Sequence, residues 1–126
     1  MHPKQLDSVT ALDAPRRYSY FVRKVADFEA VWGLYQDGWA VMADDAGNEL
    51  LPFWPEREFA EALAQGEWSS HAAKAIPLED FVEKWLPGME RDGRKASVFP
   101  TPSGKGIPVQ ASRLLADLRS EMEQYE

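Results

Sequence analysis

The sequence predicts a single α+β domain over residues 1–126, in which a small, mainly antiparallel sheet packs with about four helices. Segments rich in β-forming residues gather between residues 30 and 53, and segments with the spacing of amphipathic helices lie on both sides of them. The length and the 44% hydrophobic content are those of one ordinary globular domain, which can bury a core without a metal or a disulfide.

The N-terminal quarter predicts one clear helix. Residues 1–12 are polar, and we expect a mobile arm or a short helix there. A helix is predicted from Asp13, an N-cap residue, to Ala26, with Pro15 in the first turn, where its missing N–H does no harm. The apolar positions that mark its buried face are Tyr18, Phe21, Val22 and Val25. The basic residues Arg16, Arg17, Arg23 and Lys24 lie largely off that face.

An N-terminal three-strand meander is predicted next. Residues 30–35 and 39–43 are two β-forming runs, and Asp37-Gly38 between them is a hairpin signal. A second turn over residues 44–48 leads into a third strand over residues 49–53. This third strand contains Pro52, which removes a ladder donor and therefore favours an edge or an ending strand.

The rest of the chain alternates helices with short strands. A helix opens at Pro55 and ends near Gly66, its expected C-cap. A helix that starts at Glu79 is expected to kink or re-form near Pro87-Gly88. The remaining predicted elements are short strands over residues 74–76, 96–99 and 107–109 and a last helix capped by Ser112 that runs through Tyr125.

The amino-acid composition excludes several classes of site and disfavours several classes of partner. The chain has no cysteine and two histidines, so thiolate chemistry and cysteine- or histidine-rich metal sites are excluded, and we assign no metal and no cofactor. The net charge of −7 disfavours nucleic acid and anionic membranes as partners. No apolar stretch is long enough to span a bilayer and the first residues lack a secretory pattern, so a cytoplasmic location is expected.

Four residues are candidates for contact with a ligand or partner: Trp54, Arg57, Trp68 and His71. Most of the five tryptophans are expected in the core, but Trp54 and Trp68 lie at element boundaries and are expected to be exposed. Arg57 sits in the first turn of a predicted helix, which suggests either an anion site or a structural joint between strand and helix. His71 follows two serines, but adjacent residues rarely form a nucleophile–base pair, which favours a solvated loop.

A series of short motifs in a fixed order also resembles a known family. From roughly Tyr18 to Leu118, the chain is similar to DUF2750, a bacterial family of domains of unknown function. This resemblance implies a small bacterial protein and transfers no catalytic or binding residue. The motifs that carry it are Trp32, Asp37-Gly38-Trp39, Leu51-Pro52-Phe53-Trp54-Pro55, Phe59-Ala60, Ile76-Pro77-Leu78-Glu79-Asp80-Phe81, Trp85-Leu86-Pro87-Gly88 and Val98-Phe99-Pro100.

We interpret the chain as a non-enzymatic protein-binding or regulatory module, because it lacks a catalytic constellation and carries a surplus of aromatic residues for a small acidic domain. The expected partner is another protein. The alternative is a small-molecule or anion-binding protein, or a small enzyme, that uses the region from Trp54 to Arg57 with His71. No catalytic residue is assigned under either interpretation.

Overall fold

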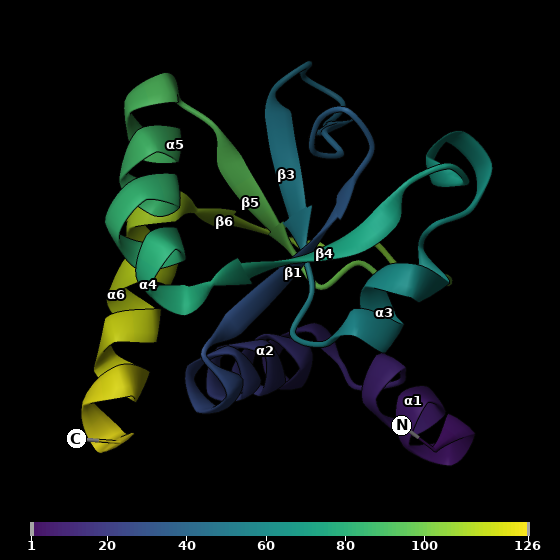
Figure 1. Cartoon of the computed structure of the whole chain (residues 1–126), viewed down its shortest axis with the longest axis horizontal. Helices are drawn as coiled ribbons and strands as arrows, with labels where there is room; N and C mark the ends of the chain where they lie inside the picture. The colour runs from purple at the N-terminus through teal and green to yellow at the C-terminus, as the bar shows by residue number, and fades with distance from the viewer. Residues whose placement is uncertain (1, 126) are drawn as a thin grey trace.

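Two small β-sheets lie at the centre of the computed structural model, which describes residues 2–125, and helices pack around them (Figure 1). This is the predicted α+β class, and most strand pairs are antiparallel. One sheet pairs β1 (Ala30–Tyr35) with β4 (Ala72–Pro77). The other has the order β2-β3-β5-β6, with β3 and β5 parallel, and consists of β2 (Met42–Ala43), β3 (Glu49–Phe53), β5 (Lys95–Val98) and β6 (Ile107–Gln110).

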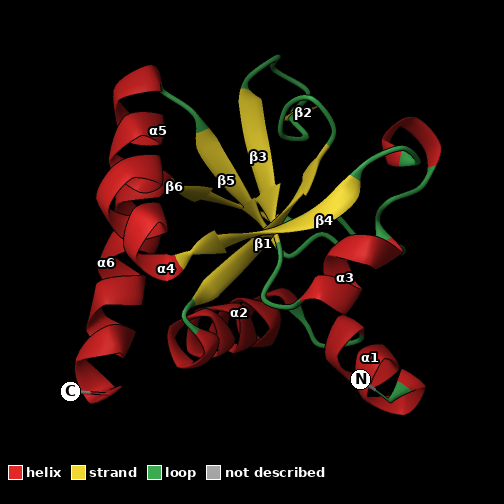
Figure 2. Cartoon of the chain, viewed as in Figure 1, coloured by secondary structure: helices red, strands yellow, loops and turns green. Residues whose placement is uncertain are grey.

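The helices cover the sheets from several sides. α5 and α6 stand next to each other at one side, and α1 and α3 lie at the opposite side (Figure 2). The helical elements are α1 (Pro3–Thr10), α2 (Ala14–Phe28), α3 (Arg57–Ala62), α4 (Leu78–Asp80), α5 (Leu86–Asp92) and α6 (Ala111–Met122), together with the short turns η1 (Gly66–Trp68), η2 (Phe81–Trp85) and η3 (Glu123–Tyr125). No helix within residues 2–125 combines the length and the apolar character needed to cross a membrane.

The predicted three-strand meander is not matched in full, because β1 pairs with β4 instead of continuing into a hairpin. The Asp37-Gly38 turn forms, but its two arms share only the Tyr35–Trp39 bridge and the backbone bonds from Gln36 to Gly38 at 2.9 Å and from Ala40 to Leu34 at 2.8 Å. The Trp39 ring lies across Gly33, so close that a Cβ there would sit 2.9 Å from it. The second antiparallel pair, β2 with β3, is present as predicted.

Three predicted helix features are confirmed or corrected by the local geometry. α2 starts where predicted, and its Asp13 cap accepts the Arg16 N–H at 3.0 Å. The predicted Ser112 cap is wrong: α6 begins at Ala111, and the Ser112 N–H donates instead to Glu90 of α5 at 3.2 Å. Gly66 begins η1 and does not cap α3. The last helix, predicted through Tyr125, ends at Met122, and the short turn η3 covers the residues from Glu123 to Tyr125.

The helix that contains Pro87 runs without a break from α4 through η2 into α5. Its middle segment, η2, is a π-type turn, in which the Leu86 N–H donates to Phe81, five residues earlier. Such a wide turn immediately before a proline relieves the clash of the ring with the carbonyl of the preceding turn. The predicted kink or re-formed helix near Pro87 therefore takes the form of this wide turn.

The core is aromatic, as the sequence predicts. Its largest fully buried side chains include Trp54, Phe21, Phe53, Phe59, Phe81 and Phe99. Phe53 and Phe81 meet edge to face at 4.8 Å between ring centroids, which is a favourable arrangement for aromatic pairs. The remaining tryptophans of the predicted core, Trp32, Trp39 and Trp85, are half-buried and pack against it.

Candidate functional site

Two of the four candidate residues belong to the core. Trp54 has no exposed surface, and its indole N–H donates to the Pro100 carbonyl at 2.9 Å. Trp68 is 9% exposed and packs edge to face on Trp54, with 6.4 Å between ring centroids. The expectation that these two tryptophans are exposed is therefore wrong, because each boundary folds inward over the sheets.

The other two candidates lie apart from each other. Arg57 is exposed at the start of α3, and its guanidinium lies 4.9 Å from the centre of the half-buried Trp32 ring. His71 is half-buried beyond η1, where its backbone N–H donates to Trp68 at 3.0 Å. The His71 Nδ1 atom is buried and has no hydrogen-bond partner among the described residues. The structure thus brings Trp68 close to Trp54 and His71, and it places Arg57 on a different tryptophan.

Arg57 and Trp32 line a surface hollow of about 570 Å³, which we call the α2–α3 hollow. It lies between the end of α2, the start of β1 and the start of α3, with one residue from α1. Its lining residues are Gln5, Lys24, Phe28, Ala30, Trp32, Glu56, Arg57 and Glu58.

The α2–α3 hollow combines exposed aromatic surface with cations. The Phe28 side chain is 56% exposed, although large apolar residues normally avoid water. The Lys24 ammonium lies 5.3 Å from the centre of the Phe28 ring and 5.6 Å from that of Tyr20, which are cation–π distances. The hollow therefore offers apolar ring faces next to two positive groups, Lys24 and Arg57.

Glu56, which lines the same hollow, takes part in a partly buried hydrogen bond. The Tyr20 hydroxyl donates to its carboxylate at 3.0 Å. Burial raises the pKa of Glu56 above its ordinary value, and the Tyr20 hydrogen bond and Lys24 oppose that rise. Burial, with the neighbouring Glu56 charge, raises the pKa of Tyr20 well above its usual range. Tyr20 therefore stays a neutral donor at physiological pH.

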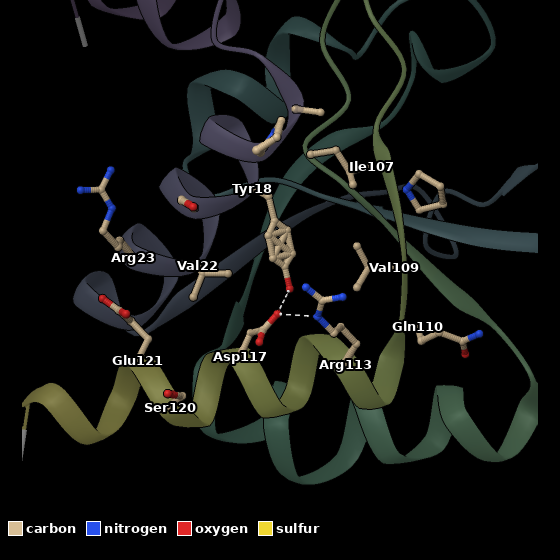
Figure 3. A pocket seen from close by; sticks show the side chains of 14 residues that line it. Tyr18, Val22, Arg23, Ile107, Val109, Gln110, Arg113, Asp117, Ser120 and Glu121 are labelled. Atoms are coloured by element: carbon tan, nitrogen blue, oxygen red, sulfur yellow. Dashed lines mark hydrogen bonds and ion pairs between the residues drawn. The ribbon is translucent and has the colours of Figure 1, made fainter.

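A second, larger depression of about 940 Å³ runs between α2 and α6 along β6 (Figure 3), and we call it the α2–α6 groove. At its centre the Tyr18 hydroxyl donates to the Asp117 carboxylate at 2.5 Å. The Arg113 Nε donates to the same carboxylate oxygen at 3.3 Å. Burial and the Asp117 carboxylate raise the pKa of Tyr18 far above its usual range, so this hydroxyl also stays protonated.

Sequence reasoning missed both clusters because their members are distant in the chain. Tyr18 and Asp117 are 99 positions apart, and neither sequence segment contains a signal that predicts contact with the other. Phe28 ends α2 and Trp32 lies in β1, and an apolar residue at such a junction is normally expected to be buried in the core. The one available signal was the run of basic residues in α2, of which Lys24 lines the α2–α3 hollow and Arg23 the α2–α6 groove.

The acidic and histidine side chains do not gather. Within the described residues, no three of His, Asp or Glu lie close enough together to hold a metal ion. The two depressions instead offer hydrogen-bonding groups, charged groups and apolar surface to a ligand or partner.

Comparison with known proteins gives one match. A family model described as "Protein of unknown function (DUF2750)" matches residues 18–118, which is most of the 126-residue chain. No curated protein and no solved structure matches the chain. The matched range confirms the resemblance expected from the order of the short motifs.

Proposed function

The chain belongs to the DUF2750 family, and we propose that it is a non-enzymatic binding module that holds another protein at the α2–α3 hollow. One observation carries the proposal: the Arg57 guanidinium lies on the Trp32 ring beside Phe28, the most exposed large apolar side chain among the described residues. Tryptophan, arginine and other aromatic residues are the types that dominate binding energy at protein interfaces.

The chemistry of the hollow describes the partner surface. An apolar side chain of the partner would cover Phe28 and Trp32, and an acidic side chain next to it would meet Lys24 and Arg57. Glu56 and Glu58 at the rim would repel a partner whose acidic groups are displaced from the two cations. The proposed partner therefore presents an apolar residue flanked by a carboxylate.

The protonation state of Tyr18 and Tyr20 supports a binding role over a catalytic one. Each hydroxyl donates to a carboxylate that lines one of the two depressions, Asp117 or Glu56, and burial raises the pKa of both tyrosines. A protonated phenol is a weak nucleophile and a weak base at neutral pH. His71, the candidate base, lines neither depression.

Comparative affinity capture tests the proposal. The immobilised protein and three variants would be exposed to the same bacterial lysate. Truncation of a central interface residue costs about 2 kcal/mol or more, or roughly 30-fold in affinity, so Phe28→Ala and Arg57→Ala should each lose the retained protein. The control is Val41→Ala, since Val41 is 41% exposed and lines neither depression. Retention that survives both Phe28→Ala and Arg57→Ala contradicts the proposal.

The alternative function is binding of a small anion. One observation favours it: two cationic side chains, Lys24 and Arg57, line the same hollow. A thermal-shift screen against small anions separates the two functions. Ligand at about a hundred times its dissociation constant adds about 2.7 kcal/mol, which raises the melting temperature of a domain of this size by several degrees. A shift that Arg57→Ala abolishes, while lysate proteins are not retained, would favour the small ligand.

The proposal places the protein in the bacterial cytoplasm, the setting expected from the sequence and from the family resemblance. Fractionation of cells that carry a tagged copy of the chain tests this part directly. Recovery with the membrane fraction at low and at high salt would contradict it.

A further inference from the structure

The α2–α6 groove is separate from the α2–α3 hollow, and the half of it beside β6 has its own chemistry. All four residues of β6 line the groove. Successive strand residues point to opposite faces, so a hollow that touches four in a row runs along the edge of the strand. β6 is the terminal strand of its sheet, and this edge is therefore the one that no other strand of the sheet covers.

The walls of this half are apolar. Ile107 and Val109 are half-buried and pack against the core, so each presents its outer surface to the groove. Pro15 and Pro108 extend the wall. The Tyr18 ring lies between this half and the half lined by Val22, Arg23, Ser120 and Glu121 (Figure 3). Pro108 has no N–H, so the strand edge is a poor template for pairing with a peptide backbone. Side-chain surface, not backbone pairing, is what this half offers.

One directed charge faces the apolar wall. The Arg113 Nε is held by Asp117, and the terminal nitrogens of the same guanidinium point into the groove between Tyr18 and Val109 (Figure 3). Asp117 is itself fixed by the Tyr18 hydroxyl at 2.5 Å. A guanidinium is a planar fork of five donors, so the end that Asp117 does not occupy matches a second carboxylate in a two-point contact.

We propose that this half of the α2–α6 groove binds a small organic acid, with its carboxylate on Arg113 and its apolar body against Ile107, Val109 and the Tyr18 ring. Asp117 is a positioning residue, because it orients Arg113, and the Tyr18 hydroxyl has the same role through Asp117 while the Tyr18 ring contacts the ligand. A cation is the wrong ligand here, since Oδ2 of Asp117 already accepts from both Tyr18 and Arg113. A free acid and the C-terminal carboxylate of a peptide share this chemistry.

An NMR titration of the full chain with acetate, butyrate and hexanoate tests the site. Burial of each added methylene should strengthen binding about fourfold, and the amide shifts should concentrate at residues 107–113 and around Tyr18. Hexanamide and hexylamine are the matched neutral and cationic probes, and both should bind at least tenfold more weakly than hexanoate. Equal binding of hexylamine, equal binding of acetate and hexanoate, or no shifts at tens of millimolar hexanoate would each overturn the proposal.

Variants separate the roles of the residues. Arg113→Gln should weaken hexanoate at least tenfold, and Tyr18→Phe, which keeps the ring, should weaken it less. The control is Arg94→Gln, which removes a half-buried cation paired with Glu49 at 3.3 Å outside the groove and should change nothing. The amide spectrum of each variant verifies its fold, and unchanged affinity in a folded Arg113→Gln overturns the proposal. Tighter binding of acetyl-leucylleucine than of hexanoate would assign the carboxylate to a peptide end.

Discussion

Arg17 of α2 is a charged residue that the sequence places off the buried face but the structure buries, with 8% of its surface exposed. Its guanidinium donates to three backbone carbonyls, those of Leu12, Phe99 and Lys105, each at 3.1 Å. Phe99 has a left-handed backbone with φ of 57°, which is uncommon for a residue with a large side chain. The arginine thus satisfies its charge with carbonyls and holds a strained turn against α2.

Substitution of Arg17 tests this clamp. Arg17→Met should lower the free energy of unfolding by about 3 kcal/mol, because buried carbonyls lose a charged donor. Arg17→Lys should also destabilise, since one ammonium cannot reproduce the guanidinium fork. Urea unfolding measures both, with the adjacent, exposed Arg16→Met as control, for which a change below about 0.5 kcal/mol is expected. Equal midpoints for Arg17→Met and Arg16→Met would refute the clamp.

Glu56 predicts a pH dependence of stability. Its raised pKa means that the fold favours the protonated form, so this contribution is fully present below the ordinary value of 4.5 and is lost as pH rises through the folded pKa. Glu56→Gln keeps an acceptor for Tyr20 and removes the charge. We expect the variant to match the wild type in acid and to exceed it by roughly 0.5 kcal/mol near neutral pH, because solvent screens this half-exposed group.

Urea midpoints measured at both pH values check the expectation. The control for loss of a negative charge as such is Glu61→Gln, which removes an exposed carboxylate of α3 that lines neither depression. A Glu56→Gln variant that is less stable than the wild type near neutral pH would show that the charge itself stabilises the fold.

At the scale of elements, the helices and the local β2–β3 pair were predictable, and the partner of β1 was not. The Asp13 cap and the apolar spacing of α2 are local signals, and both appear in the structure. The Asp37-Gly38 turn is also local and forms, with Asp37 at φ of 53°. The partner of β1, however, is β4, which follows after the four elements β2, β3, α3 and η1, and only tertiary packing selects it.

The candidate site divides in the same way. Arg57 is exposed at the start of α3, where a strand-to-helix joint places it. Trp54 and Trp68 were misplaced because an element boundary in the sequence says nothing about which way the chain turns, and here both boundaries turn inward. Arg113 and Asp117 are neighbours within α6, but Tyr18 joins them only because α2 packs on α6. The contact between these helices is a property of the whole fold, which no local pattern encodes.

The close contact between Gly33 of β1 and the Trp39 ring leads to a prediction about stability. A Cβ at this position would lie 2.9 Å from two carbons of the Trp39 ring, a contact that requires the ring or the strand to move. Gly33→Ala should therefore lower the free energy of unfolding by about 1–3 kcal/mol, the usual cost of overpacking. The control is Gly38→Ala in the following turn, where a Cβ meets nothing within 4 Å. Thermal unfolding of the two variants measures the difference, and equal melting temperatures would contradict the argument.

For the whole molecule, the two sheets share one core. Trp32 of β1 and Trp54, just after β3, exchange backbone hydrogen bonds of 2.9 and 2.8 Å, which link the sheets directly. The Trp54 indole then reaches the loop after β5 through its bond to Pro100. The buried residues of both sheets and of α2 and α6 form one continuous cluster. Neither sheet can lose its packing without exposing the other.

This shared core predicts that the chain unfolds as one domain. Tryptophan fluorescence and far-ultraviolet circular dichroism should report the same urea midpoint, which is the mark of a two-state transition. Trp54→Phe removes the bond to Pro100 and part of a fully buried side chain, so it should lower both midpoints together by an equivalent of about 1–3 kcal/mol. Phe28→Ala, which truncates an exposed residue of the proposed binding surface, should leave both unchanged. Separate midpoints for the two probes would mean that the β1–β4 sheet opens independently. In that case Trp32, which lines the proposed binding surface, would belong to a mobile element and not to a preformed hollow.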